Sequence, residues 1–167
     1  MLYIMREDLN EIDSVLVELT ELKESVCNSK PESAECSSLE NLLEKAQSLI
    51  ADLNATIELR RTLDKTIIKT DGAYLNASWE FEKRKQLTIL QFDSFVTREL
   101  KATAKDVVAK SQPQHGHSRG EEETTILNKA ERYIRDADNV AKTVTKATYL
   151  VGAIKFGIRL LLGIPLP

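Results

Sequence analysis

Aliphatic residues recur every three or four positions along four long stretches of this chain. Such a repeat places them on one side of an α-helix, whereas a half-buried strand would show simple alternation. In the first stretch, over about residues 3–28, the repeat comprises Leu2, Met5, Leu9, Ile12, Leu16, Leu19, Leu22 and Val26. Only 6 Gly and 4 Pro occur among the 167 residues, too few for a protein built of strands and turns. The sequence therefore predicts an all-α protein.

Polar segments that contain glycine or proline separate the helical stretches, at about residues 28–33, 71–72 and 111–120. Proline cannot continue a helix, and such clusters are typical of turns and loops. The second helix is expected to begin after Ser37 or Ser38, because Glu40 follows at the spacing of a capping box. It should run to about Thr70, and the third helix should cover about residues 74–110. Trp79 and Phe81 in the third helix are interpreted as core anchors.

The fourth helix opens with three acids at residues 121–123, which favour the positive end of a helix dipole. No break follows before Gly163, so a single helix is expected from residue 121 to that point. Short connections between four helices predict an antiparallel, up-down-up-down four-helix bundle. An elongated coiled coil is the alternative. Residues 1–148 would form the bundle domain, and residues 149–167 an apolar, cationic segment continuous with the fourth helix.

Charge is distributed unevenly along the chain, although the net charge is only −3. Residues 1–36 contain nine acids and three cations, whereas the chain from Asn139 onward has four cations and no acid. Such asymmetry suggests that the two ends of the chain meet different partners. An acidic helix that simply faces solvent is the alternative.

The last sixteen residues of the expected fourth helix, 149–164, carry only two charges. At about 1.5 Å per residue this segment is roughly 24 Å long, which is short of the ~30 Å hydrocarbon core of a bilayer. Both charges lie in its middle, which disfavours a simple transmembrane anchor. A narrow cationic face beside a broad aliphatic face instead suits a helix that lies in a membrane surface. The residues expected to contact a membrane or an apolar partner are Lys142, Lys146, Leu150, Ile154, Lys155, Ile158, Arg159, Leu161 and Leu162.

Two functional hypotheses follow from this segment. The first is a non-enzymatic helical-bundle protein that associates with or perturbs a membrane through its C-terminal helix. The second is a soluble adaptor or regulatory coiled-coil protein, in which that helix packs in its own core or against a partner protein. We expect a cytoplasmic protein that is peripheral at a membrane if the first hypothesis holds. A homo-oligomer is compatible with both.

Motifs for catalysis or cofactor binding are missing from the sequence, so no enzyme activity and no cofactor are expected. His115 and His117 lie in a polar loop without further ligands at fixed spacing, which argues against a metal site. The basic run at residues 83–85 lacks an aromatic stacking platform, so nucleic acid is not an expected partner. Cys27 and Cys36 flank the first turn. Free thiols are expected there, and a disulfide across the turn is the alternative.

Overall fold

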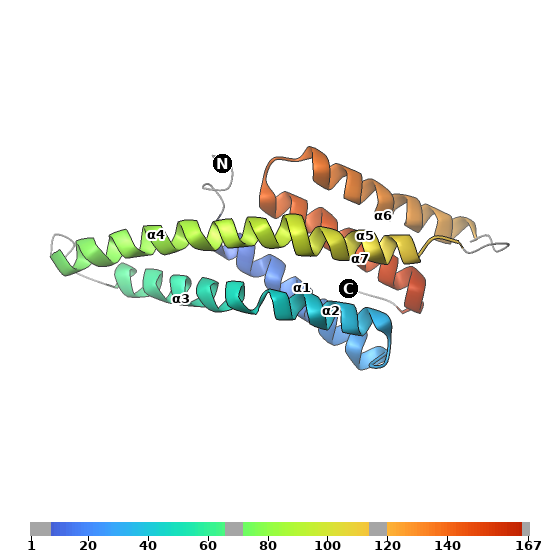
Figure 1. Ribbon diagram of the computed structural model, residues 1–167, viewed down its shortest axis with the longest axis horizontal. Helices are drawn as coiled ribbons and strands as arrows, with labels where there is room; N and C mark the ends of the chain where they lie inside the picture. Colours follow the sequence, from blue (N-terminus) through green and yellow to red (C-terminus); the bar gives the residue numbers. More distant parts are fainter. Residues whose placement is uncertain (1–7, 66–71, 114–119, 165–167) are drawn as a thin grey trace.

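The computed structural model describes residues 8–65, 72–113 and 120–164. Several sequence predictions lie outside these ranges: the first turn with Leu2 and Met5, the turn residue Asp71, and the loop with His115 and His117. Within them the chain forms helices and no strand, so the all-α class is confirmed (Figure 1). The helices are α1 (Leu9–Ser29), α2 (Ala34–Lys45), α3 (Gln47–Asp64), α4 (Gly72–Ser94), a π-helix (Phe95–Leu100), α5 (Lys101–Lys110), α6 (Glu121–Asn139) and α7 (Thr143–Leu162).

The second predicted helix begins earlier than its capping box suggested, and it is interrupted. Ser33, rather than Ser37 or Ser38, is the N-cap of α2, and its hydroxyl accepts a hydrogen bond from the Cys36 N–H at 3.0 Å. A serine at the N-cap accepts a hydrogen bond from a free N–H of the first turn, and Ser33 occupies that position two residues after Pro31. At Ala46 the helix then breaks, which separates α2 from α3.

The third predicted helix is present over its full length, because α4, the π-helix and α5 follow one another without a gap from Gly72 to Lys110. The π-helix lies at the same level as the break at Ala46. An ion pair joins the two places, with Lys45 Nζ 3.0 Å from Glu99 Oε2. Both long helices therefore change geometry where they pass each other.

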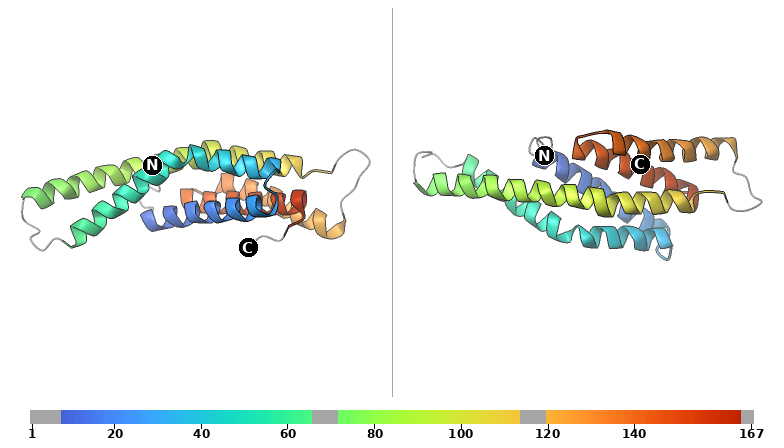
Figure 2. Two further views of the ribbon diagram at one scale, coloured as in Figure 1. Left: turned by 90° about the horizontal axis from the view of Figure 1, so that it is seen from below. Right: turned by 45° about the horizontal axis from the view of Figure 1, so that its top comes forward.

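The expected continuous fourth helix is wrong. Helix α6 ends at Asn139, and Val140 takes an extended conformation (φ −99°, ψ 145°) before α7 begins at Thr143. The chain reverses there, and α7 packs back along α6 (Figure 2). Two long-range contacts hold the reversal: the Thr143 hydroxyl donates to Asp93 Oδ1 at 2.9 Å, and Lys142 pairs with Glu11 at 2.8 Å. Residues 149–162 are thus part of α7 and are not continuous with α6.

Helix α7 lies at the centre of the core, in contact with α1, α5, α6 and the π-helix. Its approach to α5 is close, because an added Cβ at Gly157 would lie 2.5 Å from Val107 Cγ1. At the same place the Ser111 hydroxyl donates to the Gly157 carbonyl at 3.1 Å. A glycine here lets two helix backbones approach more closely than any larger residue would allow.

Helices α3 and α4 project beyond the other helices at one end of the molecule, and we call this pair the arm (Figures 1 and 2). Along the arm α3 and α4 pack mainly on each other. The buried residues of these two helices are Leu49, Leu53, Thr56, Leu63, Thr88, Ile89 and Phe92, and the Thr56 and Thr88 hydroxyls meet across the contact. Trp79 is not a core anchor as predicted, since 67% of its surface is exposed on α4, whereas Phe81 is partly buried. An arm two helices thick covers only one side of each helix.

Candidate functional site

The aliphatic residues predicted to meet a membrane or partner lie in or against the core. Leu150, Ile154 and Ile158 are 2%, 0% and 0% exposed. Leu161 and Leu162 are partly buried and pack against the same cluster. Membrane contact through this aliphatic face requires it to be exposed, and the α1, α5 and α6 helices cover it.

Two of the four cations predicted to meet an acidic surface pair with acids of the same chain. Lys155 Nζ lies 2.5 Å from Glu18 Oε1, and Lys142 Nζ lies 2.8 Å from Glu11 Oε2. Both acids belong to α1, the acidic helix at the start of the chain. Part of the charge asymmetry of the sequence is therefore used within the chain, between α1 and the start and middle of α7.

Lys146 is partly buried and belongs to a second group of charges, around Asp138 at the end of α6. The Asp138 carboxylate accepts a hydrogen bond from Lys101 Nζ at 2.6 Å. That hydrogen bond, opposed by partial desolvation and aided by the charges of Lys101, Lys105 and Lys146, lowers the pKa of Asp138 below its ordinary value of 3.8. The Lys101–Asp138 contact joins α5 to α6, so packing of these two helices accounts for this group of charges.

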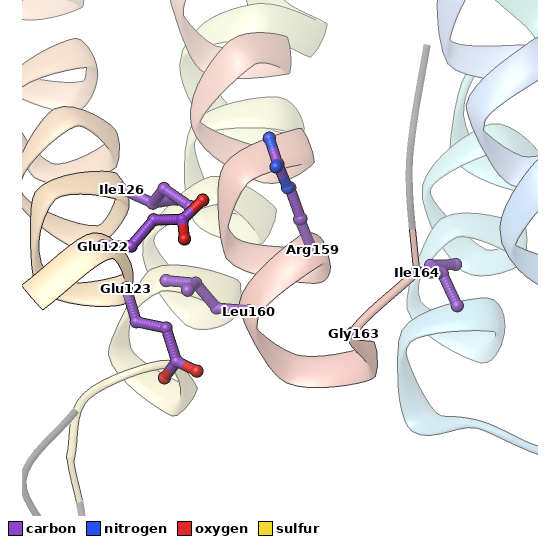
Figure 3. A pocket seen from close by; sticks show the side chains of 7 residues that line it. All are labelled: Glu122, Glu123, Ile126, Arg159, Leu160, Gly163 and Ile164. Carbon is purple, nitrogen blue, oxygen red and sulfur yellow. The ribbon is translucent and has the colours of Figure 1, made fainter. Parts of the chain in front are cut away.

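Arg159 is exposed and lines a pocket of about 380 Å³ between the start of α6 and the end of α7 (Figure 3). Glu122 and Glu123 supply carboxylates from α6, and apolar contacts come from Ile126, Leu160 and Ile164. Carboxylates are favourable in the first turn of a helix and cations in the last turn, so these charges suit the antiparallel ends of α6 and α7 without any ligand. The pocket can take a small charged group, but its composition does not single one out.

The two cysteines form a disulfide between the last turn of α1 and the first turn of α2, where free thiols were expected. The early start of α2 brings the two Cα atoms to 5.0 Å. Glu40 Oε1 lies 3.1 Å from Cys36 Sγ, so two sulfur atoms and a carboxylate are gathered in one place. A metal ion binds cysteine in its thiolate form. Because both sulfur atoms are bonded to each other, neither is a thiolate in this structure.

Exposed apolar residues gather on the arm, a feature that the sequence analysis missed. Among the described residues the large apolar side chains with high exposure are Val17 on α1 and four residues of α4: Leu75 (58%), Trp79 (67%), Leu87 (53%) and Leu90 (48%). A signal for part of this set was present, because Leu87 and Leu90 fall outside the three-four repeat of Ile89, Phe92 and Val96, whereas Leu75 and Trp79 continue that repeat. Helix α4 thus has apolar residues on two sides, of which α3 covers one.

A second hollow, of about 340 Å³, lies between α3 and α4. At its base the Thr56 and Thr88 hydroxyls lie 3.3 Å apart, and both residues are 1% exposed. Across it Gln91 Nε2 donates to Asp52 Oδ2 at 3.0 Å. These polar residues satisfy one another, so the hollow belongs to the α3–α4 contact.

None of the helices formed by the described residues combines the length and the apolar character that crossing a bilayer requires. Comparison of the chain with protein-family models, with curated proteins and with solved structures found no match. Function must therefore be argued from the arrangement of this chain alone.

Proposed function

We propose that this is a non-enzymatic helical-bundle protein that acts as an adaptor and binds another helical protein through α4 of its arm. The observation that carries the proposal is the position of its uncovered apolar surface. The most apolar helix, α7, is covered by the chain itself, whereas α4 exposes Leu75, Trp79, Leu87 and Leu90.

The size and chemistry of these four residues support a protein partner. Large contiguous apolar patches are rare on monomeric soluble proteins, and tryptophan is among the residues that contribute most at interfaces. Trp79 remains 67% exposed although the Lys83 ammonium lies 5.4 Å from its ring centroid. A helix laid along α4 would bury these side chains by the mode in which an amphipathic helix binds an apolar surface.

Paired capture experiments test this proposal. The full-length protein, the arm variant Leu75→Glu plus Trp79→Glu, and the control Val17→Glu are used to capture proteins from an extract of the source cells. Val17 is 46% exposed and lies on α1, so the control adds charge to an exposed apolar position away from the arm. We expect a partner retained by the wild type and the control to be lost with the arm variant. Equal capture by all three would contradict the proposal.

Co-sedimentation with anionic vesicles addresses membrane binding, the other hypothesis for this chain. Membrane contact through α7 requires that helix to leave the core and expose Ile154 and Ile158. Under the adaptor proposal, the wild type and the variant Lys155→Glu plus Arg159→Glu remain in the supernatant. Sedimentation of the wild type that this variant abolishes would instead favour the membrane hypothesis.

A further inference from the structure

The Cys27–Cys36 disulfide and the Glu40 carboxylate meet at the turn between α1 and α2. Glu40 Oε1 lies 3.1 Å from Cys36 Sγ and 3.9 Å from Cys27 Sγ. We propose that, when the disulfide is reduced, these three side chains bind one zinc ion through two thiolates and the carboxylate. The turn lies at the end of the molecule away from the arm, so this site is separate from the surface proposed for the adaptor (Figure 1).

Two neighbouring helices supply the three ligands. Cys27 lies in the last turn of α1 and Cys36 in the first turn of α2, with their Cα atoms 5.0 Å apart. Glu40 follows Cys36 by four residues, and residues at that spacing lie on the same side of a helix. One ligand therefore comes from α1 and two come from α2, so a bound ion would connect the two helices.

The burial of these residues suits an ion that enters from one side. Cys36 is 2% exposed, Cys27 is partly buried and Glu40 is exposed. Within the described ranges, no lysine or arginine pairs with Glu40, so no cation there neutralises its carboxylate. A disulfide sulfur carries no hydrogen, so the carboxylate is not held beside it by a hydrogen bond. After reduction, an ion bound by both sulfur atoms can take this oxygen as a further ligand.

The set of ligands favours zinc among the common metal ions. Thiolates are poor ligands for Mg²⁺ and Ca²⁺, which prefer oxygen, and a carboxylate is a poor ligand for Cu⁺. Zinc accepts both ligand types in a tetrahedral site, and a water molecule commonly completes a site with three protein ligands. Four acids and one cation occur between residues 24 and 40, so the local charge also attracts a cation.

Reduction must precede the binding of zinc. A dithiol reductant supplies two electrons and two protons, the S–S bond breaks, both cysteines become thiols, and the reductant forms its own disulfide. Zinc then displaces the two thiol protons, which pass to water, because the thiolate is the metal ligand. Two thiolates on one tetrahedral zinc ion lie about 3.8 Å apart at Zn–S distances of ~2.3 Å. Rotation about the Cα–Cβ bond of each cysteine provides this spacing.

The consequence is a turn that is fastened in either redox state. Disulfides persist in oxidising compartments and are rare in reducing ones, where a cysteine pair more often binds a metal or acts in catalysis. The disulfide links α1 to α2 under oxidising conditions, and zinc would link them under reducing conditions.

Isothermal titration calorimetry of the full-length protein with Zn²⁺ tests the site. The protein is reduced with a phosphine, which is then removed in the absence of oxygen. We expect the reduced wild type to bind one Zn²⁺ per chain, and the oxidised wild type and the reduced variant Cys27→Ser plus Cys36→Ser to bind it at least about tenfold more weakly. His115 and His117 are present in every sample, so zinc bound by them appears equally in each. Equal affinity of the reduced and oxidised wild type would overturn the proposal.

The role of the carboxylate is tested by Glu40→Gln. Loss of a residue that only orients a metal ligand already weakens metal binding by about 10–100-fold, so loss of a ligand should raise the dissociation constant for Zn²⁺ by about tenfold or more. Glu44→Gln is the matched control, because Glu44 is exposed one turn further along α2, and it should bind like the wild type. A Glu40→Gln variant that binds as tightly as the wild type would overturn the assignment of this ligand.

Absorption spectra with Co²⁺ in place of zinc identify the ligands. Thiolate ligands give Co²⁺ a charge-transfer absorption in the near ultraviolet, which we expect for the reduced wild type and not for Cys27→Ser plus Cys36→Ser. Circular dichroism covers the case in which reduction loosens the helices, because zinc should then restore the helical content. A spectrum without thiolate absorption, or a loss of helix that zinc does not reverse, would overturn the proposal.

Discussion

Helices α7 and α4 differ in how far the other helices cover their apolar residues. Helix α7 has three charged residues among 20, and its aliphatic residues are covered from several sides. Helix α4 has six charged residues among 23, yet four large apolar residues are exposed on it. The more apolar helix is thus the more completely covered one. Whether an apolar residue is exposed depends on how many helices surround its own, and less on how apolar that helix is.

The largest effect expected from this contrast is on stability. Ile154→Ala should lower the free energy of unfolding by about 2–5 kcal/mol, because it leaves a cavity in a fully covered site. Leu87→Ala on the arm should change it by less than about 0.5 kcal/mol, because 53% of that residue is already in water. Urea unfolding of both variants measures the difference. Similar values for the two would remove the contrast between α7 and α4.

Removal of the disulfide should give the second-largest loss of stability. The Cys27–Cys36 bond closes a loop with a sequence separation of 9, and loss of such a constraint costs about 2.5 kcal/mol in the chain-entropy description. Cys27→Ser plus Cys36→Ser should therefore unfold at lower urea concentration than the wild type. Hydrogen exchange at the tip of the arm should stay unchanged, because the disulfide lies between α1 and α2. Faster exchange confined to the arm would contradict this localisation.

A smaller effect is expected at the ion pair between α1 and α7. Lys155→Ala should cost up to about 1 kcal/mol, as partly exposed pairs do, because it removes the cation beside Glu18. Arg84→Ala, which breaks the exposed pair with Glu80 on the arm, should cost about 0.3–0.5 kcal/mol. Thermal unfolding with double-mutant cycles compares the two. A larger coupling on the arm would reverse the expected order.

The smallest effect concerns pH. The pKa of Asp138 is lowered in the folded protein, mainly by the hydrogen bond from Lys101. Its ionised carboxylate therefore stabilises the fold above the ordinary pKa of 3.8, and this stabilisation is lost as the pH falls through the lowered pKa. Asp138→Asn should be slightly less stable than the wild type at neutral pH and equally stable in strong acid. A difference that does not depend on pH would contradict this assignment.

The sequence predicted a helix well where its apolar residues lie on one side and that side packs on the core. In α1 the three-four repeat named Leu9, Ile12, Leu16, Leu19, Leu22 and Val26, and all of them are buried. It failed at Val140, because the reversal there contains neither glycine nor proline. Contacts with Asp93 and Glu11, which are distant in sequence, hold that turn. No local pattern reports such contacts.

The candidate site was missed for a related reason. Trp79 was taken as a core residue because large aromatic residues usually are, and the covering of α4 on one side alone is a property of the assembled helices. The predicted contact residues of α7 were chosen for their apolar character. An apolar helix can equally well be buried in the core, and a single sequence does not distinguish a core helix from one that contacts a membrane or a partner.

The π-helix at Phe95–Leu100 sets the direction in which the arm presents its surface. A π-turn inserts about one extra residue into the helical repeat, and one residue corresponds to roughly 100° of rotation about the helix axis. The side of α4 that looks outward is therefore offset from the side of α5 that meets α7 in the same long helix. Deletion of one residue within 95–100 would leave the sequences of α4 and α5 unchanged. It would rotate α4 relative to α5, so Trp79 would point in a different direction.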